Sequence, residues 1–182
     1  MIIEQTLNEA GLFAGHEIRT RSGQYVDVLN PTPEMIHIED IAHALSFQPR
    51  FAGHLPRFYS VAQHCVHVAE WLMHYGTYHK IFLEGLLHDA TEAYLIDVPS
   101  PIKGLLTEYK QIENNLNEVI AQRFGLITPY SLFVKQADNY MLRREWHEFV
   151  LREPVVQPLP LWYPETAKEQ FLNMFDTLNT FK

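Results

Sequence analysis

The chain has 182 residues, of which 47% are hydrophobic and 20% are charged, and its net charge is −8 with the histidines neutral. This length allows one domain to bury a substantial core without disulfides, so we expect a single domain over residues 1–182. The acidic balance disfavours the binding of long nucleic acids, which depends on basic patches, but it permits a small phosphorylated ligand held by a few local cations.

The first 30 residues are typical of irregular or β structure, with a Ser-Gly turn signal and a short alternating run in SGQYVDVLNPTP. The segment HIEDIAHALSF then predicts a short amphipathic helix, which the prolines and the glycine of QPRFAGHLPRF end. Four further helices are predicted: one from Ser60, one from about Tyr78 to Tyr94, one over EYKQIENNLNEVIAQRFG, and one from about Ser131 to Leu151. A last helix begins near Glu165. The fold class expected is all-α, with at most a small β hairpin near the N-terminus.

The helix from Ser60 has the clearest apolar stripe, because its hydrophobic residues recur at helical spacing. The stripe consists of Val61, Cys65, Val68, Ala69, Leu72 and Met73. Cys65 is the only cysteine and cannot form an internal disulfide or a cysteine zinc site, which favours a reducing compartment. No apolar run approaches the roughly 20 residues that span a bilayer, and the N-terminus lacks a signal-peptide pattern. We therefore expect a cytoplasmic protein with no membrane partner.

Polar residues that could bind a metal interrupt three of these helices. His88, Asp89 and Glu92 project toward one sector of a helix, since they are three or four residues apart. His64 lies at the edge of the apolar stripe of the preceding helix, and Asp138 lies on the core side of the fourth helix. A charged aspartate facing a core is costly unless it is paired or bound to a cation. Each residue alone is more often a polar core residue than a ligand, and periodicity does not show that the three helices converge.

Several stretches resemble the HD-domain metal-dependent phosphohydrolases. VAQHCVHVA, GLLHDATEAYLIDVPSPIK and VKQADNYML carry the His…His-Asp…Asp pattern of that superfamily, and IEDIAHALS and RFAGHLPRFYSVAQH resemble its small phage and bacterial members. The resemblance runs from about Tyr25 to Asp138. It implies an HD-domain helical bundle that binds one divalent metal ion, with Mn, Co, Zn, Fe, Ni and Mg as candidates. The ligands implied are His64, His88, Asp89 and Asp138.

The resemblance also implies roles for residues around the metal. The relatives include deoxynucleoside 5′-monophosphatases and phage deoxyadenosine triphosphate triphosphohydrolases. In them, the Glu at the position of Glu92 assists catalysis, and the Asp at the position of Asp97 borders the nucleotide sugar and the catalytic water. An Arg of an upstream Arg-Trp pair meets phosphate there, and this chain departs from that spacing. Its candidates for substrate binding are Arg50, His54, Arg57 and Lys103.

The activity expected is therefore that of a metal-dependent hydrolase, and the expected partner is a small deoxynucleotide. A dATP-type triphosphohydrolase that releases nucleoside and triphosphate is favoured. A 5′-nucleotidase acting on deoxynucleoside monophosphates is the alternative, because the bond broken is chemically alike. A nucleotide-binding adaptor or sensor is the non-enzymatic alternative. It is disfavoured because the four ligand positions and Glu92 are all intact.

Two questions stay open at this stage. His67 follows His64 by three residues and could be a further ligand, but the chain lacks the adjacent histidines expected of a two-metal site, so one metal is favoured. The aromatic segment PLPLWYP could form a contact between subunits of a homo-oligomer, or it could fold against its own domain.

Overall fold

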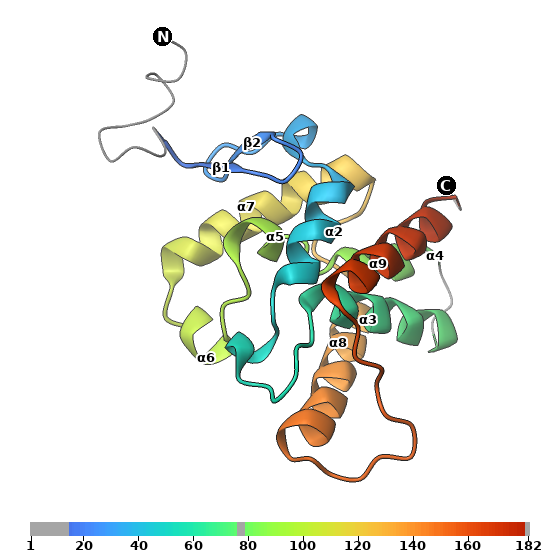
Figure 1. Ribbon diagram of the computed structural model, residues 1–182. Helices are drawn as coiled ribbons and strands as arrows, with labels where there is room; N and C mark the ends of the chain where they lie inside the picture. The colour runs from blue at the N-terminus through green and yellow to red at the C-terminus, as the bar shows by residue number, and fades with distance from the viewer. Residues whose placement is uncertain (1–14, 76–78, 181–182) are drawn as a thin grey trace.

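In the computed structural model, residues 15–75 and 79–180 are described, and helices dominate them (Figure 1). A small antiparallel hairpin precedes the helices: β1 (Glu17–Arg19) pairs with β2 (Tyr25–Asp27). The predicted all-α class with a small β segment near the N-terminus is therefore confirmed. Residues 1–14 of the segment predicted as irregular or β structure lie outside the described residues.

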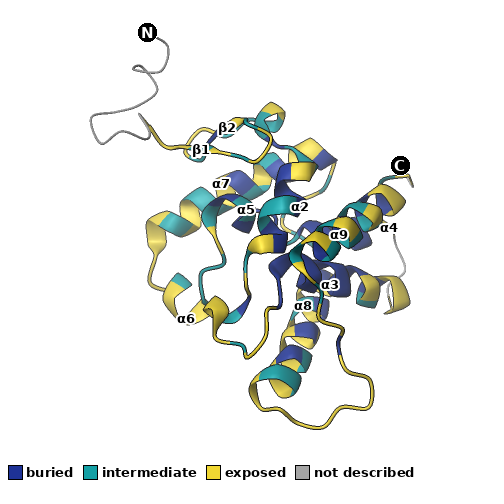
Figure 2. Ribbon diagram, viewed as in Figure 1, coloured by how far each residue is buried: buried dark blue, intermediate teal, exposed yellow. Residues whose placement is uncertain are grey.

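The central helix is α3 (Val61–Tyr75), which packs against α2, α4, α8 and α9. Its first nine residues, 61–69, are all buried, whereas most of its last turns are exposed (Figure 2), and five of the six residues of its predicted apolar stripe are buried. Met73 is the exception, with 43% of its surface exposed. The helices around α3 are α2 (Ile38–Phe47), α4 (His79–Leu87), α8 (Leu132–Glu145) and α9 (Pro164–Asn179).

The close packing of α3 against α4 depends on Gly85. A Cβ atom at this position would come within 2.3 Å of the Leu72 side chain, and within 3.7 Å of the backbone of Ala69. A larger residue would therefore force the Leu72 side chain to move. This contact matters for the site described below, because α3 and the turn that follows α4 carry three of its residues.

The prediction of a single helix from about Tyr78 to Tyr94 is wrong, because the structure has two helices in this segment. Tyr78 lies outside the described residues, α4 ends at Leu87, and a separate short helix, α5, covers Glu92–Leu95. Between α4 and α5, backbone hydrogen bonds join residues that are three positions apart. The N–H of Glu92, for example, donates to the carbonyl of Asp89 at 2.9 Å. The ring of His88 donates from Nδ1 to the carbonyl of Gly85 at 2.7 Å, which would otherwise accept the next bond of the α4 ladder.

The remaining elements match the predicted order. After the one-turn α6 (Ser100–Lys103), the long α7 (Thr107–Phe124) ends at Gly125, whose φ of 71° is the left-handed conformation that favours glycine. The fourth predicted helix is α8, and it continues as a π-helical turn over Trp146–Val150. The connection over residues 151–163 then loops away from the bundle and returns to α9 (Figure 1).

Part of this connection is fastened to α3 by Gln63, whose side chain has no exposed surface. Its amide donates to the carbonyl of Pro160, and its oxygen accepts from the backbone N–H of Trp162 at 3.1 Å. The segment PLPLWYP therefore lies partly against its own chain, with Leu159 only 6% exposed.

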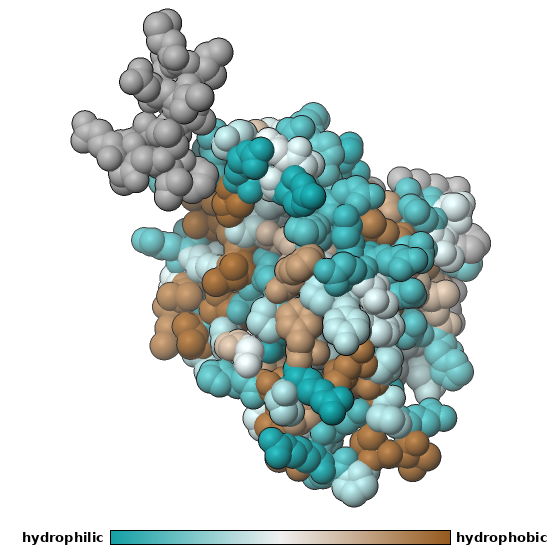
Figure 3. Space-filling model, viewed as in Figure 1, coloured by the Kyte–Doolittle hydropathy of each residue, from teal (hydrophilic) through white to brown (hydrophobic). Residues whose placement is uncertain are grey.

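Exposed apolar side chains gather at two places on the face shown in Figure 3, around α6 and the start of α7 and along the connection before α9. Ile102, Leu105 and Leu106 belong to the first group, and Val155 and Val156 to the second. Whether either forms a homo-oligomer contact stays a prediction. Within residues 15–75 and 79–180, none of the helices has the length and apolar character needed to cross a membrane.

Candidate metal centre

Four side chains from three segments lie close together in the structure: His64 from α3, His88 and Asp89 from the turn after α4, and Asp138 from α8. His64 Nε2 lies 3.2 Å from Asp138 Oδ1, and His88 Nε2 lies 3.2 Å from Asp89 Oδ2. The two crossed nitrogen–oxygen distances are both 3.8 Å. The structure therefore brings the four predicted ligands together. His64, His88 and Asp138 form one possible metal-binding group, and Asp89 belongs to a second group that shares His88.

The hydrogen bonds of the two rings determine which nitrogens face this point. His64 donates from Nδ1 to Glu145 Oε1 at 2.7 Å, and His88 donates from Nδ1 to the carbonyl of Gly85. A carbonyl or a carboxylate has no proton to give, so both Nδ1 atoms carry hydrogen. The Nε2 atoms of both rings are buried, and neither makes a hydrogen bond with any residue that the structure describes. Two ring nitrogens free to act as ligands thus face two carboxylates.

The spacing of these atoms suits a shared cation. Two ligand atoms that each lie about 2.1 Å from one ion are about 3.0 Å apart at right angles and about 3.4 Å apart at the tetrahedral angle. The nitrogen–oxygen distances of 3.2 and 3.8 Å are close to these values. Imidazole and carboxylate together suit borderline-to-hard divalent ions, so the donor set fits the metal that the resemblance implies.

The electrostatics of the pocket also favour a positive charge. Burial lowers the pKa of His88, but the negative charge of Asp89 and contacts with both carboxylates outweigh burial and raise that pKa well above its ordinary value. Burial likewise opposes ionisation of Asp138, but the two imidazoles outweigh it and hold the pKa of Asp138 well below its usual range. A site that attracts a proton this strongly also attracts a metal cation, which competes for the same nitrogen atoms.

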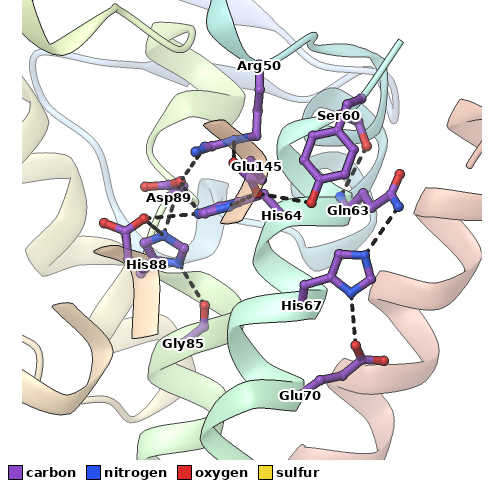
Figure 4. Close-up of polar contacts among 12 residues, drawn as sticks. Arg50, Ser60, Gln63, His64, His67, Glu70, Gly85, His88, Asp89 and Glu145 are labelled. Atoms are coloured by element: carbon purple, nitrogen blue, oxygen red, sulfur yellow. Dashed lines mark hydrogen bonds and ion pairs between the residues drawn. The ribbon is translucent and has the colours of Figure 1, made fainter. Parts of the chain in front are cut away.

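Glu145 is a site residue that sequence reasoning missed. Its side chain has no exposed surface, and it accepts hydrogen bonds from His64, Arg50 and Tyr59 (Figure 4). Burial opposes its ionisation, but the adjacent His64 and Arg50 outweigh burial and lower the pKa of Glu145. The available signal was helical spacing, since Glu145 follows Asp138 and Met141 on the inner side of α8.

A cavity of about 970 Å³ opens beside the four ligands. Asp89 and Asp138 form part of its wall, together with Glu92 and Asp97. Apolar and aromatic side chains make up much of the rest, including Phe51, Leu142 and Trp146. A volume of about 300–1,000 Å³ with a few convergent polar groups is typical of a small-molecule site.

Glu92 and Asp97 lie where they can act inside this cavity. Glu92 is 5% exposed, and its Oε2 is buried with no hydrogen-bond partner. Burial and the nearby Asp89 and Asp97 raise the pKa of Glu92 well above its usual value, and burial also raises the pKa of Asp97. The side chain of Gln48 contacts the backbone of both residues. It donates to the carbonyl of Glu92 at 2.8 Å and accepts from the backbone N–H of Asp97 at 3.1 Å.

The four candidate substrate-binding side chains divide into two groups. Arg50, His54 and Lys103 line the cavity, whereas Arg57 is exposed and does not. Arg50 is 9% exposed and places Nη1 3.8 Å from Asp89 Oδ2. Lys103 pairs with Glu113, and its Nζ lies 4.0 Å from Glu92.

Three further basic side chains of the cavity come from α8 and beyond it: Arg143, His147 and Arg152. Arg143 and Trp146 both lie on the cavity wall, with Trp146 46% exposed, although the regular helical spacing of α8 would put Trp146 on the core side. The π-helical turn that begins at Trp146 changes the helical period, so a regular period of 3.6 misplaces the side chains from Trp146 onward.

His67 does not join the four ligands. Its Nδ1 bonds to Glu70 at 2.9 Å, and its Nε2 lies 3.3 Å from the amide of Gln63 (Figure 4). Cys65 lies near His88 and Asp89, but burial raises the pKa of its thiol to about 11, which keeps the sulfur protonated near neutral pH. The histidine and carboxylate atoms are therefore the better donors.

Unusual backbone conformations concentrate at this cavity. Among the described residues, the non-glycine residues with positive φ are Phe51, Ala52, Ile96 and Arg152. Phe51, Ala52 and Arg152 line the cavity, and Ile96 immediately precedes Asp97. Such conformations cost on the order of 1–3 kcal/mol each and tend to cluster at functional sites. Their distribution is a second indication, independent of the titratable groups, that this cavity is the functional site.

Comparisons with known proteins find relatives but no activity. The "Uncharacterized protein YfdR" of Escherichia coli is 42% identical over 149 residues, which cover 79% of this chain and 80% of the relative. The "Uncharacterized protein RCAP_rcc00048" of Rhodobacter capsulatus is 37% identical over 136 residues, which cover 70% of this chain and 69% of the relative. No protein-family model matches the chain.

Proposed function

This chain belongs to the same family as the YfdR protein of Escherichia coli and the RCAP_rcc00048 protein of Rhodobacter capsulatus, and we propose that it is an HD-type, metal-dependent phosphohydrolase that acts on deoxynucleotides. Neither relative's name gives an activity, so the proposal depends on the chemistry of the site and on the sequence resemblance to HD-domain enzymes.

One observation carries the proposal. The Nε2 atoms of His64 and His88 are buried without hydrogen bonds, and each lies 3.2 Å from a carboxylate oxygen, of Asp138 and of Asp89 respectively. Unpaired buried polar atoms are costly, and a cation between nitrogen and carboxylate would satisfy them all. A single divalent ion held by these four residues can polarise a phosphoryl oxygen and can make water a stronger nucleophile at neutral pH.

The other residues of the cavity suit hydrolysis of a phosphate ester. Water attacks the phosphorus, the bond to the 5′ oxygen of the sugar breaks, and that oxygen must receive a proton. Glu92 lines the cavity with one unpaired oxygen, and its raised pKa favours the protonated form, which can deliver a proton to the leaving oxygen. Arg50, fixed beside Asp89, can stabilise negative charge on the phosphoryl group.

The cations beyond the four ligands favour a triphosphate over a monophosphate. Arg143 follows Asp138 by five residues on α8, about 7.5 Å along the helix axis, and Arg152 lies beyond the π-helical turn. A monophosphate would be neutralised by the metal and Arg50 alone. Basic groups further along the cavity suit the β and γ phosphates, so we favour a dATP-type triphosphohydrolase that releases nucleoside and triphosphate.

A nucleotide panel tests the proposal directly. Purified protein is incubated with deoxynucleoside mono- and triphosphates and with Mn²⁺, Co²⁺ or Mg²⁺, and triphosphate and orthophosphate are measured separately. Release of triphosphate from dATP is expected, whereas orthophosphate from monophosphates alone would make the protein a 5′-nucleotidase. Binding without hydrolysis would identify an adaptor or sensor. An Asp89→Ala variant that retains metal and turnover would contradict the metal-centred scheme.

A further inference from the structure

Glu145 joins three elements of the site through one buried carboxylate. Its Oε1 accepts from His64 Nδ1 at 2.7 Å and from the Tyr59 hydroxyl at 3.0 Å, and its Oε2 accepts from Arg50 Nε at 3.0 Å. Figure 4 shows it between Arg50 and His64, on the side of the ring away from Asp89. It is the last residue of α8, about two turns after Asp138.

The bond to His64 determines which face of the imidazole can bind a cation. Glu145 accepts a hydrogen bond from Nδ1, which keeps the ring proton on that nitrogen. The lone pair of the neutral ring is then on Nε2, which points toward Asp138 and Asp89. A partner on the far nitrogen fixes the orientation of a metal-binding histidine, and a negatively charged partner also makes the ring a stronger ligand. The equivalent nitrogen of His88 donates its hydrogen bond to a backbone carbonyl, which has no net charge. The charged orienting group is therefore on His64.

The bond to Arg50 fixes a cation on the other side of the same carboxylate. With Nε bound to Glu145, the guanidinium is oriented so that Nη1 lies 3.8 Å from Asp89 Oδ2. Arg50 immediately precedes the strained residues Phe51 and Ala52, and only 9% of it is exposed. One carboxylate thus fixes a histidine of α3 and an arginine of the preceding loop, both next to Asp89.

We propose that Glu145 is a positioning residue of the metal centre. It holds His64 in the form whose Nε2 is free to bind a divalent cation, and it holds Arg50 against Asp89. The inference rests on the proposed function in requiring that a divalent cation occupies the four-residue site, but it does not require that any nucleotide is hydrolysed.

The variant Glu145→Gln separates orientation from simple packing, because it keeps the shape and removes the charge. An amide has one oxygen and one NH₂ group, so it cannot accept from both His64 and Arg50. If the NH₂ group faces His64, it donates to Nδ1, and the ring proton moves to Nε2, where it blocks the cation. If the NH₂ group faces Arg50, it meets the Nε–H of the guanidinium. Both groups are hydrogen-bond donors, so the guanidinium must move.

The test is isothermal titration of Mn²⁺ into wild type, Glu145→Gln and Asp40→Asn. Asp40 is a matched control, since it is a 4% exposed carboxylate that accepts three hydrogen bonds outside the site. We expect Glu145→Gln to weaken Mn²⁺ binding by about 10–100-fold. Asp40→Asn should change it by less than about twofold. Thermal denaturation of both variants measures the loss of stability that a purely structural role would share.

The outcomes distinguish this inference from the proposed function. If Glu145→Gln binds Mn²⁺ as tightly as wild type does, the inference is overturned even if the enzyme hydrolyses nucleotides. If it binds weakly and wild type hydrolyses nothing, the inference stands and the proposed function fails. If wild type binds no divalent cation, both fail.

A measurement on wild type alone covers the case in which Glu145→Gln does not fold. In Zn²⁺-loaded protein labelled with ¹⁵N-histidine, Nδ1 of His64 should carry the proton and Nε2 should not. The reverse assignment would overturn the inference.

Discussion

Two groups of carboxylates in this protein have opposite patterns of hydrogen bonding. Asp40, at the start of α2, accepts from the hydroxyl groups of Thr20 and Ser22 at 2.8 and 2.6 Å and from the N–H of Ser22 at 2.8 Å. Asp89 and Asp138, at the cavity, instead face the unpaired Nε2 atoms of two histidines. The hydrogen bonds of Asp40 are supplied within the chain, whereas Asp89 and Asp138 face those two nitrogens, with Arg50 Nη1 3.8 Å from Asp89 as a further cation.

This difference separates a structural carboxylate from a ligand. Donors supplied by Thr20 and Ser22 connect Asp40 to the loop between β1 and β2, so its role is to fasten the hairpin to α2. Asp89 and Asp138 face imidazole nitrogens, and Asp89 also faces Arg50, in place of hydroxyl and backbone donors. Low exposure alone would have selected Asp40 rather than these two, whose side chains are 22% and 36% exposed. The unpaired Nε2 atoms select the carboxylates beside the cavity instead.

The strongest test of this contrast is Asp138→Asn. The amide removes one of the two carboxylates that oppose the histidines, so we expect metal-induced stabilisation to disappear and turnover to fall to background. In wild type, a cation at about 100 times its Kd should add about 2.7 kcal/mol to the free energy of unfolding. Thermal denaturation with and without Mn²⁺ measures this. Asp176→Asn, the same change at an exposed site on α9, should keep the full stabilisation. Stabilisation retained by Asp138→Asn would remove Asp138 from the ligand set.

Glu92→Gln should separate catalysis from metal binding. Glu92 lines the cavity but is not among the four converging ligands, and the amide cannot release a proton to the leaving oxygen. We expect kcat to fall by about 10²–10⁴-fold with little change in Mn²⁺ affinity. Steady-state kinetics and calorimetry measure the two effects, and Glu118→Gln, exposed on α7, serves as the control. Equal losses of kcat and metal affinity would show that Glu92 is a ligand.

Most of the helical architecture was predictable because it follows from local periodicity. The apolar stripe of α3 and the glycine that ends α7 are properties of short stretches of sequence. The break between α4 and α5 was not, because it accompanies a side-chain bond from His88 to the Gly85 carbonyl in a segment whose composition is helical. The π-helical turn at Trp146 was missed for a related reason, since no residue there is a helix breaker.

The site was predictable in part. The four ligand positions came from residue types and order, and their convergence required the packing of α3 against α4 and α8. Glu145 and Gln48 were missed because their roles depend on partners far away in sequence: Glu145 with His64 and Arg50, and Gln48 with Glu92. A buried glutamate in an otherwise polar stretch such as RREWHEF gives no local sign of such partners.

Arg143→Ala tests whether the cavity extends to a triphosphate, and it should have a moderate effect. Arg143 is exposed and lines the cavity, so it should contact only the distal phosphates. We expect KM for dATP to rise about tenfold, the value of one charge-assisted hydrogen bond, with KM for dAMP unchanged. Arg144→Ala is the neighbouring control, because Arg144 instead donates to the carbonyl of Gln157. Equal changes for both substrates would place Arg143 near the reacting phosphate.

Asp40→Asn should have the smallest effect on the site and a clear effect on stability. Burial opposes ionisation of Asp40, but the hydrogen bonds from Ser22 and Thr20 outweigh it and lower its pKa. A lowered folded-state pKa contributes stability that is present above the unfolded value of about 3.9 and is lost as pH falls through the folded value. Wild type should therefore lose this contribution below about pH 4.

The variant should be less stable by about 1–3 kcal/mol at neutral pH, and its acid denaturation curve should be correspondingly flatter. Glu39→Gln is the control on the same helix, since its side chain is 64% exposed and pairs only with Lys168 at the surface. That change should cost less than about 1 kcal/mol. Urea denaturation between pH 3 and pH 7 measures both variants, and a loss of Mn²⁺ binding in Asp40→Asn would show that the two groups of carboxylates are not independent.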